Sequence, residues 1–195
     1  MIIGVTGDTH NNLKNIRNIC SLFNENRADL VVHTGDISIP KSLLAFQDLN
    51  CPLVAVFGNN DIQEKNGLEL AAKDFNCNIF EEPHTLNISD KVISVLHHPD
   101  LIDEEMISRS DIILHGHTHR FRLESKDSCV IFNPGECAGF MKGKNQIGVF
   151  NLKKIQPKII IGVIKAGSAA IKELILSLKE AFSSVLICLH LNKTR

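Results

Sequence analysis

The sequence MIIGVTGDTH, at residues 1–10, places a short apolar run directly before the polar turn Gly7-Asp8-Thr9-His10. Helical stretches and apolar runs alternate after this turn, in the order helix 12–26, strand 29–34, helix 40–49 and strand 52–57. This alternation predicts parallel strands joined by crossover helices. The first helical stretch repeats its apolar residues at spacings of three, four and seven, so we expect one face of that helix to pack on a sheet.

The pattern shortens after one more helical stretch, near residues 64–75. Apolar runs separated by turn residues predict further strands at 85–88, 92–97, 112–115, 121–124, 129–133 and 146–152. Short strands at this spacing predict a mostly β sheet that packs on the first sheet. We therefore expect residues 1–152 to form one α/β domain of two facing sheets with helices outside.

The C-terminal residues differ in charge from the rest of the chain. Residues 1–150 have 13 basic and 20 acidic side chains, whereas residues 151–195 have 8 basic and 2 acidic ones. We expect a strand at 157–164 and an amphipathic helix at 168–190, which contains too many charges for the run of about 20 apolar residues that spans a membrane. The region 153–195 is then an extension and not an independent domain. It packs on the domain or on a second copy in a homo-oligomer, or, alternatively, lies on a membrane surface.

The composition also limits the partners and the compartment. With 21 Lys or Arg against 22 Asp or Glu, the net charge is −1, so the counterion release that drives nucleic-acid binding is missing and we expect no nucleic-acid partner. The chain begins on a strand, without the basic residues and long apolar run of a signal peptide. None of the six cysteines forms a Cys-x-x-Cys pair. We therefore expect a cytoplasmic protein with buried, reduced thiols.

Metal-ligating side chains follow several of the predicted strands, at the points where these strands end. They are Asp8 and His10, Asp36, Asn59, His97, and His117 and His119. Any one of them alone is most simply a turn residue, a helix cap or a surface histidine. Because the carboxyl ends of parallel strands converge on one rim, we expect all seven to meet there.

The kinds of donor in this set indicate the metal. Mixed imidazole, carboxylate and amide ligands suit Mn, Fe, Zn or Ni, whereas a pure carboxylate cage suits Mg or Ca. Seven donors are too many for one tetrahedral site, so two divalent ions that share a bridging carboxylate are the economical interpretation. The remaining histidines lack neighbours of the right kind, and we expect structural roles for His33, His84, His115 and His190.

Six short motifs of the sequence, taken in order, resemble those of a known family. They are Gly7-Asp8-Thr9-His10, Gly35-Asp36, Gly58-Asn59-Asn60-Asp61, His97, Gly116-His117-Thr118-His119 and Asn133-Pro134-Gly135-Glu136. This order resembles the calcineurin-like metallophosphoesterases, and within them the small archaeal and bacterial phosphodiesterases that are related to the scaffold subunit of retromer. The resemblance implies a four-layer αββα sandwich of two mixed sheets with flanking helices and a dinuclear metal centre. It assigns Asp8, His10, Asp36 and His119 to one metal and Asp36, Asn59, His97 and His117 to the other, with Asp36 as the bridge.

The sequence departs from the family in three places. The strand-end histidine is followed by His98 and Pro99 instead of Gly and His, so His97 or His98 is the ligand, and we favour His97. Asn60 occupies the position at which the larger members have a histidine that is their presumed proton donor. Nothing in the resemblance accounts for residues 153–195.

The resemblance implies an enzyme that hydrolyses a small phosphodiester with two divalent ions, most simply Mn and otherwise Ni, Fe or Zn. A metal-bridging hydroxide would attack phosphorus in line, and His10, Asn60 and Asp61 would assist, with Asp61 orienting His10 or Asn60. The alternatives are a non-catalytic, metal-binding interaction scaffold of the same fold and a hydrolase of non-phosphate esters. The presence of all seven donors favours the enzyme, because a scaffold has no need of them.

Overall fold

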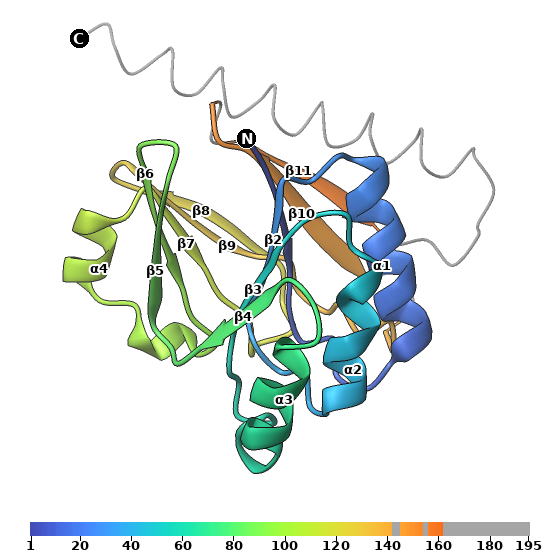
Figure 1. Cartoon of the computed structure of the whole chain (residues 1–195). Coiled ribbons are helices and arrows are strands. Elements are labelled where there is room, and N and C mark those ends of the chain that lie inside the picture. Colours follow the sequence, from blue (N-terminus) through green and yellow to red (C-terminus); the bar gives the residue numbers. More distant parts are fainter. Residues whose placement is uncertain (142–144, 154–155, 162–195) are drawn as a thin grey trace, which may run out of the picture. The chain divides into compact units, whose positions relative to one another are not determined.

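A computed structural model describes residues 1–141, 145–153 and 156–161 of the chain, and they belong to one compact unit (Figure 1). For residues 156–161 it describes the backbone alone. The predicted amphipathic helix at 168–190 lies outside the described residues, and so does Cys188. Their predicted roles therefore stay predictions.

The first sheet has six strands in the order β11-β10-β1-β2-β3-β4. The strands β1 to β4 run parallel. On the other side of β1, β10 pairs antiparallel with β1, and β11 pairs antiparallel with β10. The bounds of these strands are β1 (Ile2–Thr6), β2 (Leu30–His33), β3 (Leu53–Val56), β4 (Cys77–Phe80), β10 (Gln146–Asn151) and β11 (Gln156–Ile161). The chain therefore returns to complete this sheet only after it has built the second one.

The second sheet has five strands in the order β5-β6-β7-β9-β8. The strands β6, β7 and β9 are parallel, while β5 and β8 pair antiparallel at the two edges. The bounds of these strands are β5 (His84–Ile88), β6 (Lys91–Val95), β7 (Ile112–Leu114), β8 (Arg122–Lys126) and β9 (Cys129–Asn133). Both sheets are thus mixed, and each has a parallel centre whose strand ends point the same way.

Helices cover the outer faces of the two sheets (Figure 1). Their bounds are α1 (Leu13–Glu25), α2 (Pro40–Leu44), α3 (Lys65–Ala72) and α4 (Glu104–Arg109), with the 3-10 helices η1 (Ala45–Asp48), η2 (Ile62–Glu64) and η3 (Pro99–Leu101). The helices α1, α2 and α3 pack on the first sheet, and α4 packs on the second. The predicted αββα sandwich is therefore confirmed.

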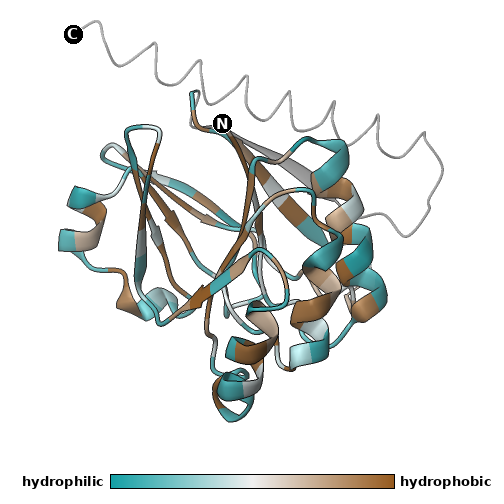
Figure 2. Ribbon diagram, in the orientation of Figure 1, coloured by the Kyte–Doolittle hydropathy of each residue, from teal (hydrophilic) through white to brown (hydrophobic). Residues whose placement is uncertain are grey.

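Three apolar layers hold the sandwich together. One lies between the first sheet and its helices, with Phe23 and Phe46 fully buried, and a smaller one lies under Met106 and Ile107 of α4. The third lies between the two sheets and includes Phe132 and Phe150, whose rings meet edge to face at 5.0 Å. Apolar residues accordingly line the strands, and hydrophilic ones cover turns and outer helix surfaces (Figure 2).

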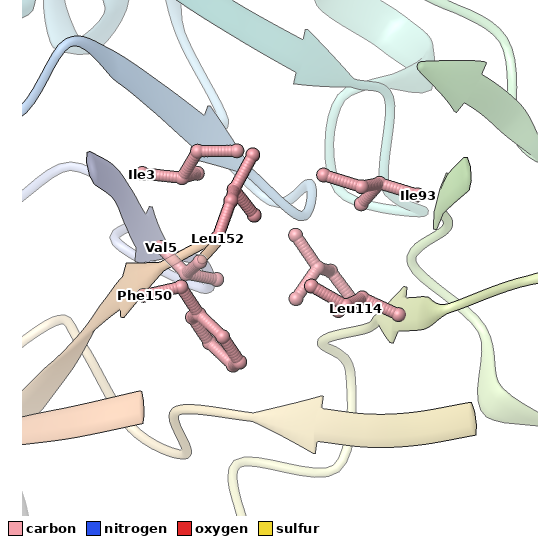
Figure 3. A pocket seen from close by; sticks show the side chains of 7 residues that line it. Ile3, Val5, Ile93, Leu114, Phe150 and Leu152 are labelled. Carbon is pink, nitrogen blue, oxygen red and sulfur yellow. The ribbon is translucent and has the colours of Figure 1, made fainter. Parts of the chain in front are cut away.

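The layer between the sheets contains a small gap in its packing. Figure 3 shows that Ile3, Val5 and Phe150 of the first sheet point toward Ile93 and Leu114 of the second. The walls of the gap are entirely apolar, and the gap is too narrow for a water molecule. It is therefore part of the core and not a ligand site.

Two elements, β4 and α4, were absent from the sequence prediction. The strand β4 contains the polar residue Asn78 and lies at the edge of its sheet, so its apolar run is short. The helix α4 has six residues and is held by its N-cap, where the Asp103 carboxylate accepts the Met106 N–H at 2.7 Å. In addition, β6 ends at Val95, so that His97 follows the strand instead of ending it.

The described residues contain no helix that is long and apolar enough to cross a membrane.

One polar side chain lies deep in the strands of the first sheet. His33, at the end of β2, is fully buried between the loops that follow β1 and β2. Its Nδ1 accepts the Gly35 N–H at 3.2 Å, and its Nε2–H therefore donates to the Thr9 hydroxyl at 2.8 Å. Burial lowers the pKa of His33 to about 3, so the ring is neutral in the folded protein.

We expect His33 to make the protein acid-sensitive. The unfolded chain takes up a proton below about pH 6.5, which the folded chain resists, so His33 weakens stability by about 1.4 kcal/mol per pH unit as pH falls. The variant His33→Gln lacks this dependence. Urea unfolding of both proteins in chelator, from pH 7 to pH 4.5, measures it, and equal pH slopes would contradict a neutral buried His33.

Candidate metal centre

All seven predicted donors meet where strands of both sheets end. Asp8 and His10 follow β1, Asp36 follows β2 and Asn59 follows β3, while His97 follows β6 and His117 and His119 follow β7. Within the described part of the chain, the residues that could hold an ion form two groups. The first group is Asp8, His10, Asp36 and His119, and the second is His97, His98 and His117.

The first group joins two carboxylates and two imidazoles. Each of the four residues offers one ligand atom, and these four atoms all lie within 4.8 Å of one another. The Nε2 atoms of His10 and His119 are 3.5 Å apart, and His119 Nε2 is 3.5 Å from Asp8 Oδ1. The other ring nitrogen of His10, Nδ1, is 3.2 Å from the Ser38 hydroxyl, which orients the ring. This donor mixture suits a first-row divalent ion.

The second group gathers around the Asn59 side chain. Asn59 Oδ1 lies 3.0 Å from both His97 Nε2 and His117 Nδ1, which are 3.3 Å from each other. His97 Nε2 is also 3.4 Å from Asp36 Oδ1. Asp36 therefore belongs to the first group and touches the second.

His97 and His98 make different contacts, although both belong to the second group. Nδ1–H of His97 donates to the Thr34 carbonyl at 2.9 Å, which leaves the Nε2 lone pair facing Asn59 and Asp36. Nδ1 of His98 instead faces the Glu82 carboxylate, and its ring lies 4.5 Å from that of His117. This geometry favours His97 as the ligand and leaves His98 beside the centre, at its edge.

The backbone around the donors is held in an unusual conformation. Non-glycine residues with positive φ cluster here: Asp8 (48°), His10 (48°), Asp36 (62°), Ser38 (77°), His117 (69°) and His119 (53°). Such residues are uncommon, and each costs roughly 1–3 kcal/mol. The surrounding fold has to offset this energy, and the strained turns fix the directions of these side chains.

Two glycines allow the loops to approach one another closely. A Cβ on Gly58 would lie 2.3 Å from Asp36 Oδ1, and a Cβ on Gly35, whose φ is +96°, would lie 2.7 Å from His97 Nδ1. Any side chain at either position would push a donor out of place. The glycines before Asp36 and Asn59 are therefore required by the site itself.

The two carboxylates differ in their surroundings. Burial, followed by the negative charge of Asp36, raises the pKa of Asp8 to about 8, against the lowering effect of the His117 N–H. For Asp36, burial is outweighed by hydrogen bonds from Asn60 and by the nearby His97, and its pKa lies below the usual value. A divalent cation between them would allow both to be ionised at neutral pH, because it compensates the charge that burial and repulsion disfavour.

Asn60 and Asp61 make contacts other than the predicted ones. Asn60 donates its backbone N–H and its Nδ2–H to the two oxygens of Asp36, at 2.9 and 2.7 Å. The buried Asp61 carboxylate accepts the N–H groups of Asp36, Ser38 and Gly58, at 2.9, 2.6 and 2.8 Å. Among the described residues these three N–H groups are the hydrogen-bond partners of the Asp61 carboxylate, and neither His10 nor Asn60 is one of them, so the prediction that Asp61 orients one of these two residues stays a prediction. Asp61 ties the loops after β2 and β3 together.

Sequence reasoning missed several supporting residues. Ser38, Glu82 and the Thr34 carbonyl orient the three histidines 10, 98 and 97. Asn133 donates from Nδ2 to the Gly116 carbonyl at 2.9 Å and thereby supports the turn that presents His117. Glu82 and Ser38 have no distinctive spacing in the sequence, whereas Asn133 belongs to the motif Asn133-Pro134-Gly135-Glu136, which is part of the family resemblance.

Fold and site together define an α/β sandwich with carboxylate, amide and imidazole donors gathered at its strand ends. Residues 1–154 match the family model described as the calcineurin-like phosphoesterase superfamily domain. The chain belongs to this superfamily, as its motifs predicted.

Individual relatives agree with this membership. A phosphodiesterase of Methanocaldococcus jannaschii is 33% identical over 165 residues, which cover 83% of this chain and 99% of the relative. The solved structure of an archaeal phosphodiesterase superposes with a TM-score of 0.76 at 32% identity, covering 83% of this chain and 99% of the other. Vps29 of Entamoeba histolytica, in a single-mutant form, gives a TM-score of 0.56 at 18% identity over 82% of this chain and 98% of its own, which shows the fold alone.

We expect Asp61→Asn to damage both stability and metal binding. The amide nitrogen would face a backbone N–H in place of an acceptor oxygen, which we expect to cost about 2 kcal/mol in the free energy of unfolding. Because the loops carrying Asp36 and Asn59 lose their tie, affinity for divalent ions should fall as well.

Urea unfolding and calorimetric titration with Mn²⁺ measure the two effects of Asp61→Asn. Asp48→Asn makes the same chemical change at an exposed position of η1 and serves as the control. A variant Asp61→Asn that matches this control in both measurements would refute the role given to Asp61.

Proposed function

We propose that the chain is a metal-dependent phosphodiesterase that uses two divalent ions. The observation that carries this proposal is the meeting of two donor groups at Asp36, which belongs to the first and lies 3.4 Å from His97 of the second. A single shared carboxylate is the arrangement expected for a two-ion centre.

In this proposal each residue has a definite task. Asp8, His10 and His119 hold one ion, Asn59, His97 and His117 hold the other, and Asp36 binds both. Bound there, the two ions supply Lewis-acid chemistry, since they activate water as a nucleophile near neutral pH and neutralise charge on phosphate oxygens. Asp8, Asp36 and His97 are buried, while Asn59 and His117 are exposed, so the donors form a fixed floor with a rim open to substrate.

A relative indicates the substrate, and the donor types indicate the metal. The relative that is 33% identical is a phosphodiesterase, which supports a phosphodiester substrate for this chain. We propose a small one, and Mn as the metal, since mixed nitrogen and oxygen donors suit Mn as well as Fe, Zn and Ni. The five described cysteines are all free thiols, which supports a cytoplasmic location in a reducing compartment.

The decisive test is metal-stripped protein assayed against phosphodiesters, phosphomonoesters and carboxylic esters, with Mn, Ni, Fe or Zn restored in turn. We expect no activity without metal, and the highest activity on aryl phosphodiesters with Mn. Two bound ions without turnover of any ester would favour the scaffold alternative. Cleavage of carboxylic esters alone would favour the other hydrolase.

Asp36→Asn tests the shared carboxylate. Because the substitution removes the negative charge that both ions use, we expect fewer than one bound ion per chain and a larger loss of activity than in His119→Ala. Metal analysis of the purified variants, together with assays on an aryl phosphodiester, measures this. Two ions in Asp36→Asn with a nearly unchanged rate would contradict the bridging role.

Asn60 tests the source of the leaving-group proton. An amide has no proton that titrates near neutral pH, so it cannot serve as a general acid, whose help is typically worth about 10²–10⁴-fold. We expect aryl phosphodiesters to be cleaved well and alkyl phosphomonoesters poorly, and Asn60→His to improve the poor class selectively.

The measurement for Asn60→His is the slope of log kcat/KM against leaving-group pKa in both proteins. Because Asn60 also donates to Asp36 at 2.7 Å, bound metal has to be counted in each sample. A shallow slope that Asn60→His leaves unaltered would assign proton donation to another residue, and His98, whose Nδ1 faces Glu82, is then the candidate to test.

A further inference from the structure

Glu136 is a buried carboxylate that the proposed function does not use. It follows β9 in the turn Asn133-Pro134-Gly135-Glu136 and is 2% exposed. Its Oε1 accepts the Phe140 N–H at 2.9 Å. Its Oε2 is buried and has no hydrogen-bond partner among the described residues. An ionised oxygen left in this state costs free energy unless a charge compensates it.

The turn that holds Glu136 is joined to the metal centre. Asn133 accepts the Gly135 N–H at 2.7 Å through Oδ1, and its Nδ2 donates to the Gly116 carbonyl and to the Thr118 hydroxyl, at 2.9 and 3.1 Å. These two acceptors flank His117 and precede His119. The position of Glu136 is thus coupled through Asn133 to the loop that presents two of the donors.

The charge of Glu136 acts on the same side of the centre. It raises the pKa of the Asp8 carboxyl, together with burial and Asp36, and it raises that of His119 against the lowering effect of burial. The negative charges of Asp36 and Glu136 thus both disfavour ionisation of Asp8. A cation bound among these carboxylates would be attracted by each of them and would favour their ionised forms.

We propose that Glu136 is a positioning residue of the metal centre, whose buried charge retains the cation held by Asp8, His10, Asp36 and His119. It is not one of the ligands and acts on the ion through its charge. This inference rests on the proposed function, since it needs the first ion to bind.

The test is Glu136→Gln, which keeps the shape and the acceptor for the Phe140 N–H but removes the charge. Groups that support metal ligands typically change metal affinity by about 10–100-fold, and we expect Mn²⁺ to bind at least tenfold more weakly. The metal-free variant should be as stable as the wild type or more so, because a repulsion is removed. Glu136→Asp keeps the charge and should restore most of the affinity.

Calorimetric titration with Mn²⁺ and urea unfolding in chelator measure the two properties. Glu69→Gln, an exposed position on α3, controls for the change in net charge. Unchanged Mn²⁺ affinity in Glu136→Gln overturns the inference, and so does a metal-free variant that is less stable or fails to fold, since Glu136 is then a structural turn residue. Wild-type protein that binds no Mn²⁺ would instead overturn the proposed function.

Discussion

Two buried carboxylates, Asp8 and Asp36, have ligand atoms within 4.8 Å of each other at the strand ends of the two sheets, where burial and the charge of Asp36 disfavour ionisation of Asp8. Each is supplied with donors: the His117 N–H faces both oxygens of Asp8 at 3.1 Å, and Asn60 donates twice to Asp36. These hydrogen bonds favour the ionised forms only in part, since the pKa of Asp8 is still raised to about 8. A pair of divalent ions completes the compensation in the function proposed here.

Holding these groups in place is costly for the backbone. Left-handed backbone at Asp8, His10, Asp36, His117 and His119 costs energy, which the surrounding structure has to offset. The three apolar layers of the sandwich hold the strands in place. Asp61 then fixes the loops after β2 and β3 by accepting three backbone N–H groups. The gap between the two sheets is narrow and apolar and is therefore not a ligand site.

Three residues beside the donor set, Asn60, His98 and Glu136, make contacts that bear on the centre. Asn60 is bound to the proposed bridging carboxylate by two hydrogen bonds, which gives it a task that does not require proton transfer. The His98 ring is oriented by the Glu82 carboxylate. The Glu136 carboxyl is a third buried acidic group, after those of Asp8 and Asp36. In the function proposed here, these neighbouring residues set metal affinity and leaving-group preference around the donor set.

The sequence by itself determined the alternation of strands and helices and the two facing sheets, and it indicated seven candidate donors, because hydrophobic periodicity and strand-end motifs are local properties. It did not reveal β4 or α4, whose short elements depend on sheet-edge pairing and on an N-cap. Nor could it assign the contacts of Asp61, Asn60, His97 and His98. Those depend on which backbone N–H groups and carbonyls lie nearby once residues far apart in the chain meet. Only the tertiary structure decided them, since hydrogen bonds across loops act over a few ångströms in space and leave no periodic trace in the sequence.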